Sequence, residues 1–270
     1  MTRRTACLLL GAAPAARAQL REIEIDASRV AGEIRPVFGL NVPDDERQAA
    51  ALLAAPLDAL VRLGPRVPRR AELAEALPLA WLDEEGGMLA VWKADAVLEP
   101  LAEAAHAVAV ASEGLDREPR AAYFTPRDGR LFDDNGGPVP AAVALGWASS
   151  LLETPRRIEV RGGEGLAIVA GVSADGATVR VVVANRLRGG DESGPEGFVL
   201  RVRGLPWGER EFAVERRRMN DAFGAVEFRT GAGRGGEARV VSRLPAPGVE
   251  WIELRRLDGP AGPVAPRRRV

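Results

Sequence analysis

Apolar and polar residues alternate with a period of two through most of the chain after residue 156. Glycine-rich turns, such as Gly162-Gly163, Asp175-Gly176 and Gly189-Gly190, separate the alternating segments. Alternation with closely spaced turns indicates antiparallel strands that bury one face. We therefore predict an antiparallel β-sandwich over residues 156–257. Its strands are expected at residues 157–160, 166–172, 178–185, 197–203, 211–217, 226–229, 238–243 and 249–255.

The N-terminal half has a different pattern, in which short apolar segments are interspersed with helical ones. Residues 22–26 alternate like a half-buried strand, and residues 78–82 form a short apolar strand candidate. Residues 95–111 carry alanine and leucine at helical spacing, and Pro100 either starts or kinks this helix. Residues 121–155 read as a strand, a Gly/Asp/Asn turn and a helix. The predicted fold class is mainly β, with a smaller α/β part before the sandwich.

Residues 1–18 have the pattern of a signal peptide. Arg3 and Arg4 form a basic start, a short apolar run follows, and Ala16-Arg17-Ala18 is a small-x-small cleavage site. The apolar run is far shorter than the ~20 residues of a membrane span. We therefore expect export to the periplasm or the extracellular space, with no membrane attachment after cleavage. The arginine pair leaves both the general secretory and the twin-arginine routes open.

Composition excludes several classes of function. The formal net charge of −1 argues against a nucleic-acid partner, which would favour a basic excess. Cys7 is the only cysteine and His106 the only histidine, so we expect no disulfide, no His/Cys metal site and no cofactor. Arg216-Arg217-Arg218, the basic cluster of the sandwich, is expected at a solvated strand end. Residues 258–270 lack an apolar period and are expected to be disordered.

Two stretches carry a family resemblance. The segment IDASRVAGEIRPVFGLN at 25–41 resembles the start of family 39 glycoside hydrolases, the β-xylosidases and their relatives. Residues 104–155, including Tyr123-Phe124 and Gly137-Pro138-Val139-Pro140, are similar to that family's seventh helix, eighth strand and eighth helix. The resemblance implies a (β/α)₈ barrel followed by a sandwich. Such a barrel needs about 250 residues, so we expect residues 19–155 to form only an incomplete barrel remnant.

The resemblance also implies a retaining mechanism with two carboxylates about 5 Å apart. In these barrels the general acid/base belongs to an Asn-Glu pair, and the sequence contains no Asn-Glu. The nucleophile should end the seventh strand, where carboxylates of barrel enzymes lie. Residues 79–82 are an apolar segment ending in acids, which makes Glu84 the candidate nucleophile and Asp83 and Glu85 the alternatives. An ordinary acidic loop before Gly86-Gly87 is the competing interpretation.

Trp207 is the candidate for carbohydrate binding. Exposed aromatic rings stack on sugar faces, and of the five tryptophans Trp207 lies in a turn, Gly204-Leu205-Pro206-Trp207-Gly208. The competing interpretation is that Trp207 packs in the core. The expected partner is a carbohydrate, either xylan-like or another plant or bacterial glycan.

Three hypotheses follow for the function. The first is an exported, barrel-deficient relative of glycoside hydrolases, catalytically incompetent, whose N-terminal strand returns to the sandwich. The second is a carbohydrate-binding or adhesion module that uses Trp207. The third is an active glycosidase with Glu84 as nucleophile.

Overall fold

The computed structural model describes residues 20–34, 38–40, 90–92, 100–115, 122–124, 139–186, 196–220 and 225–257. The predictions for the signal peptide, for the acidic residues 83–85 and for the C-terminal tail fall outside these ranges.

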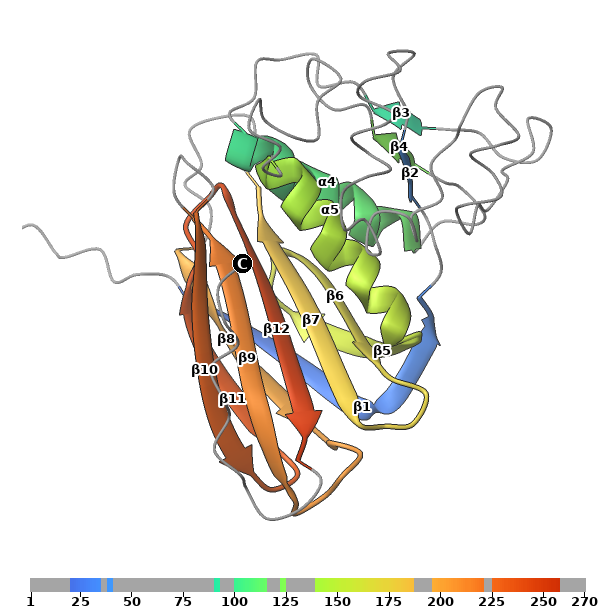
Figure 1. The fold of residues 1–270 in the computed structure, drawn as a ribbon, viewed down its shortest axis with the longest axis vertical. Coiled ribbons are helices and arrows are strands. Elements are labelled where there is room, and N and C mark those ends of the chain that lie inside the picture. Colours follow the sequence, from blue (N-terminus) through green and yellow to red (C-terminus); the bar gives the residue numbers. More distant parts are fainter. Residues whose placement is uncertain are drawn as a thin grey trace, which may run out of the picture.

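A single nine-stranded sheet dominates the described residues (Figure 1). Its order is β10-β9-β12-β7-β6-β5-β1-β8-β11. The sheet folds over at the β5–β6 junction, where pairing is limited to two positions, Arg156 with Val172 and Arg157 with Gly171. The strands are β1 (Leu20–Glu33), β5 (Arg156–Gly162), β6 (Ala167–Val172), β7 (Thr178–Asn185), β8 (Gly197–Arg203), β9 (Glu211–Met219), β10 (Val226–Arg234), β11 (Ala238–Arg243) and β12 (Gly248–Arg256).

The predicted fold class is confirmed: the chain is mainly β, and each of the eight strands expected after residue 156 is present. Every strand pair within residues 156–257 is antiparallel, as predicted. The sheet as a whole is mixed because of β1, whose direction the sequence did not predict. β1 pairs antiparallel with β5 on one side and parallel with β8 on the other. Alternation shows that a segment forms a strand with one buried face, but it carries no information on the direction of the neighbouring strand.

The inner face of the folded sheet holds the main core. Ile23 and Ile25 from β1 lie with Phe198 and Leu200 from β8 and with Ile252 from β12, all at most 1% exposed. Burial of large aliphatic and aromatic side chains is the main favourable term in folding. The alternating positions of β1 therefore face this core, as the sequence pattern predicts.

Two helices cover the outer face of β6, β7 and β12 (Figure 1). α4 (Pro100–Leu115) begins at Pro100, which settles the alternative between a start and a kink, and α5 (Pro140–Ser150) also begins at a proline. Proline suits the first helical turn because its missing N–H would be unpaired there anyway. A 3₁₀ turn, η2 (Leu151–Glu153), follows α5. β7 is thus buried on both faces, which accounts for its near-continuous valine run.

A second, smaller sheet consists of three parallel strands in the order β2-β4-β3. These are β2 (Phe38–Leu40), β3 (Ala90–Trp92) and β4 (Ala122–Phe124). Figure 1 shows this sheet beyond the helices, on the side away from the nine-stranded sheet. The three strands belong to the N-terminal α/β part that the sequence predicts.

The hairpin between β6 and β7 is stabilised by an aspartate. Asp175 Oδ1 accepts hydrogen bonds from Ser173 Oγ at 2.6 Å and from the Ala177 N–H at 3.0 Å. The hydrogen bond from Ser173, followed by that from Ala177, lowers the pKa of the Asp175 carboxyl. A lowered folded-state pKa stabilises the fold above the ordinary aspartate pKa of about 3.9. That contribution is lost as the pH falls below this value through the folded-state pKa.

We expect Ile25→Ala to lower the free energy of unfolding by about 2–5 kcal/mol, because it removes buried volume between two paired strands. Val30→Ala is the matched control, since Val30 lies on the same strand and is 57% exposed. Its effect should be within about 0.5 kcal/mol. Urea denaturation followed by circular dichroism measures both. Equal losses would contradict the central position of β1.

Candidate functional site

The predicted catalytic acids are not among the described residues. Glu84, Asp83 and Glu85 all fall between β2 and β3, and their assignment stays a prediction. β4 lies between β2 and β3, and β3 begins at Ala90, after these three acids in the sequence. The first carboxylate after β3 in the sequence is that of Asp95.

Trp207 is buried. Its side chain is 6% exposed and belongs to the inner core, where its ring centroid lies 5.9 Å from that of Phe212. An aromatic ring that stacks on a sugar must present a face to solvent, and Trp207 does not present one. The structure favours the packing interpretation. A turn sequence indicates a reversal of the chain but not the direction in which its aromatic side chain points.

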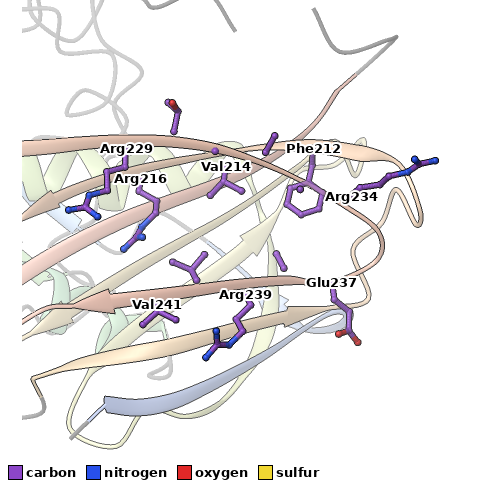
Figure 2. Close-up of a pocket in the computed structure, with 14 residues that line it drawn as sticks. Phe212, Val214, Arg216, Arg229, Arg234, Glu237, Arg239 and Val241 are labelled. Atoms are coloured by element: carbon purple, nitrogen blue, oxygen red, sulfur yellow. The ribbon is translucent and has the colours of Figure 1, made fainter. Parts of the chain in front are cut away.

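A groove lies between β10 and β11 on the sandwich (Figure 2). Its volume is about 380 Å³. Among the strands that the structure describes, β10 pairs with β9 alone and β11 with β8 alone, so these two strands are the edges of the nine-stranded sheet. The groove therefore marks the side on which the sandwich stays open.

Glycines shape the groove. Gly231 pairs with Val214, and Gly233 pairs with Phe212, so both glycines share the face of β9 that carries these apolar side chains. A Cβ at Gly233 would lie 2.4 Å from the Phe212 ring, whereas a Cβ at Gly231 would meet nothing within 4 Å. Gly233 therefore lets the Phe212 ring pack closely against the β10 backbone, and Gly231 leaves open space in the groove.

A buried ion pair lies beside the groove. Glu250 on β12 is fully buried, and its Oε1 accepts hydrogen bonds from Arg216 on β9, with Nε at 2.7 Å and the terminal nitrogen at 2.5 Å. The hydroxyl of Ser242 on β11 donates to the other oxygen of Glu250. This network joins the two layers of the sandwich at the side where no backbone pairing joins them.

Arg218 makes a second connection between the free edges. One guanidinium nitrogen donates to the carbonyl oxygen of Arg243 on β11 at 2.8 Å, and the other binds the carboxylate of Glu227 on β10. The side chains of Arg216 and Arg218 are 16% and 12% exposed. The expectation of a solvated strand end is therefore wrong for these two arginines. The alternation that places Arg216 and Arg218 on the inner face was the signal that could have identified them.

Arg217 points to the opposite face of β9. Its guanidinium lies 4.7 Å from the centre of the Trp251 ring. Arg180 contacts the same ring at 5.7 Å and also pairs with Glu253 at 2.7 Å and with Glu153 at 2.6 Å. Since Glu153 lies in η2, just after α5, this cluster attaches the helices to the outer face of the sheet.

The groove does not have the chemistry of a glycosidase active site. A two-carboxylate mechanism needs a pair of acids facing a common space. Among the groove-lining residues the one acid is Glu237, while the cationic residues are Arg216, Arg229, Arg234 and Arg239. Glu250 is buried and bound to Arg216 and Ser242. Within the described ranges no group of three His, Cys, Asp or Glu residues could hold a metal ion, and no helix is long and apolar enough to cross a membrane.

Comparison with known proteins gives similar structures but no similar sequence families. No protein-family model matches this sequence, and no curated protein matches it. A glucosidase from Croceicoccus marinus is similar with a TM-score of 0.54 and 26% identity, over 64% of this chain and 45% of the glucosidase. A GH39 enzyme from Xanthomonas axonopodis pv. citri has a TM-score of 0.46 and 11% identity, over 59% and 41%. A GH30 endoxylanase from Clostridium papyrosolvens has a TM-score of 0.42 and 13% identity, over 63% and 41%.

This chain spans less than half of the length of each of these proteins. Of these three proteins the glucosidase has the highest TM-score and identity. The described residues therefore have a fold that glycoside hydrolases contain.

We expect Glu250→Gln to destabilise the fold by about 3–5 kcal/mol, because it leaves the Arg216 charge largely buried without a partner. Glu22→Gln is the control, since Glu22 pairs with Arg201 at 3.3 Å on the surface, with 67% of its side chain exposed. Such an exposed pair contributes about 0–1 kcal/mol. Thermal unfolding of both variants tests the difference. A Glu250→Gln variant as stable as the parent would contradict the bridging role of the network.

Proposed function

We propose that this chain is an exported glycoside-hydrolase-like protein that keeps the sandwich and a remnant of the catalytic barrel, and that it does not hydrolyse glycosides efficiently. The order of strands in the small parallel sheet is the observation that carries this proposal.

In an eight-stranded parallel barrel, closure places the last strand between the first strand and the seventh. The small sheet has this arrangement: β4, the last of its strands in the chain, lies between β2, the first, and β3. All three strands are parallel. α4 connects β3 to β4, and α5 follows β4, as a seventh and an eighth barrel helix would. The sheet thus corresponds to strands seven, eight and one.

The length of the chain between β2 and β3 supports the loss of the intervening strands. About 50 residues separate Leu40 from Ala90, whereas five strand-helix units of a barrel would need about 150. The comparison concerns an internal segment, so it holds wherever the chain begins or ends. Not all five intervening units fit into this segment, and we propose that the unit bearing the acid/base residue of the resembled family is among those lost.

Two carboxylates must be held rigidly on either side of the scissile bond for efficient hydrolysis. No Asn-Glu pair is present in the sequence, so the acid/base pair of the family that the sequence resembles has no counterpart in this chain. The retained ligand class is proposed to be carbohydrate, and xylan-like glycans are the first to test. Residues 1–18 are proposed to act as a signal peptide that directs export.

A panel of aryl α- and β-glycosides tests the catalytic part of the proposal. We expect the purified protein to show no turnover above the buffer rate, with a complete family 39 β-xylosidase as positive control. Glu84→Gln and Asp95→Asn are assayed alongside, since Asp95 is the first acid after β3 in the sequence. Turnover that is lost in either variant would identify an active glycosidase and reject the proposal.

Expression of the full chain in a bacterial host tests the export part. We expect the exported protein to begin at Gln19, as measured by intact mass, because Ala16-Arg17-Ala18 is a small-x-small site. Ala18→Arg should block this cleavage. Replacement of both Arg3 and Arg4 by lysine should abolish export only if the twin-arginine route is used. Retention of the uncleaved chain in the cytoplasm would overturn the assignment.

A further inference from the structure

β10 is an exposed edge strand with little protection against pairing. Eight of its nine residues are exposed and the ninth, Gly233, is half-buried. Phe228 and Val226 are 57% and 44% exposed, which places two of the exposed large apolar side chains of the described residues on this strand. Edge strands usually avoid association through charged side chains, especially lysine, through proline or through bulges. β10 carries Glu227, Arg229 and Arg234, whose charges are of both signs. β10 contains no proline and no lysine, and it pairs with β9 without a register shift.

The backbone edge of β10 has no strand partner within the described sheet. The groove of about 380 Å³ separates it from β11, the other free edge (Figure 2). Unpaired N–H and C=O groups along such an edge form a template for another strand. A partner strand can therefore add to β10 without displacing any pairing that the sheet already has.

The two faces of β10 differ in chemistry. Phe228 pairs with Arg217, and Arg217 lies over Trp251, so Phe228 is on the face of the sheet that carries the helices. Glu227 and Arg229 pair with Arg218 and Arg216 and are on the inner face. Opposite charges one residue to either side of an exposed aromatic ring make the segment Glu227-Phe228-Arg229 complementary to an antiparallel copy of itself.

We propose that β10 pairs with β10 of a second copy of this chain, antiparallel and centred on Phe228. Residues directly opposite each other in such a pair share a face. Glu227 of each copy then lies opposite Arg229 of the other, which gives two ion pairs on the inner face. The two Phe228 rings meet on the opposite face, and Val226 lies opposite Thr230.

Charge repulsion favours the register centred on Phe228 over the alternative registers of the same two strands. Centring on Arg229 places two arginines opposite each other, and centring on Glu227 places two glutamates opposite each other. Like charges directly opposite are destabilising. Centring on Thr230 places Glu227 and Arg229 opposite glycines, without any ion pair. If one strand slips by one residue, its side chains turn to the other face of the sheet, and Glu227 no longer lies opposite Arg229.

Self-complementarity favours a second copy over a glycan as the occupant. Among the residues that line the groove, Phe212 is the one aromatic residue and is 2% exposed, so the groove has no platform for stacking a sugar. A pairing of two short edges buries less than the ~1,600 Å² of a standard interface. The dimer is therefore expected to dissociate on dilution.

Sedimentation velocity over a concentration series tests the proposal by charge reversal. The full chain carrying Cys7→Ser is the parent, since Cys7 is the only cysteine. Glu227→Arg and Arg229→Glu should each weaken dimerisation at least tenfold, because each places like charges opposite each other. The double variant restores both ion pairs with reversed polarity and should recover the parental dissociation constant within about threefold.

Glu227 also binds Arg218 and Arg229 within one copy, so a folding defect must be distinguished from a loss of pairing. Circular dichroism is recorded for every variant. A parent that is monomeric at all concentrations overturns the proposal. So does a dimer that both single variants leave unchanged, or a double variant that stays monomeric while folded.

Disulfide cross-linking tests the register directly. Directly opposite residues have Cβ atoms about 4.5–5.5 Å apart, close enough for a disulfide after a small adjustment. Phe228→Cys in the Cys7→Ser parent should cross-link two copies on mild oxidation. Val241→Cys is the matched control, on the other free edge and 44% exposed. It should cross-link at least tenfold more slowly. Equal rates would indicate random collisions and reject the register.

Discussion

The sandwich depends on the insertion of β1 between β5 and β8. β1 is hydrogen-bonded along both edges, and its inward side chains Ile23 and Ile25 are fully buried. Without β1 the strands β8 and β11 would have no backbone hydrogen bonds to the rest of the sheet. The pairing of Leu20 with Gly197 joins residues far apart in the chain, so this contact carries a large loop-closure cost that core burial must offset.

The helices are the second element on which the fold depends. α4 and α5 bury Val182, Ala184 and Trp251 on the outer face of the sheet, which would otherwise present a broad apolar surface to solvent. Arg180 fastens this layer through Glu153 and Glu253. The sandwich therefore depends on α4 and α5 to cover this face, and the barrel loss that we propose leaves both helices in place.

The side of the sandwich between β10 and β11 is not closed by backbone pairing. Polar side chains rather than backbone hydrogen bonds join its two layers there, through Glu250 with Arg216 and Ser242 and through Arg218. Buried ion pairs contribute less to stability than apolar packing, but removing one partner is costly because the other is left desolvated. The same arrangement leaves the edge of β10 free, and a free edge is what association with another strand requires.

The strands of the sandwich could be predicted from the sequence, because alternation with glycine turns is a local pattern within each segment. The same holds for the start of α4 at Pro100 and for an α/β part before the sandwich. The parallel pairing of β1 with β8, the burial of Trp207, the inward direction of Arg216 and Arg218, and the pairing of β3 with β4 required the folded structure. Each of these depends on which distant segment lies alongside, and residue periodicity records the exposure of a face but not the identity of the neighbour that covers it.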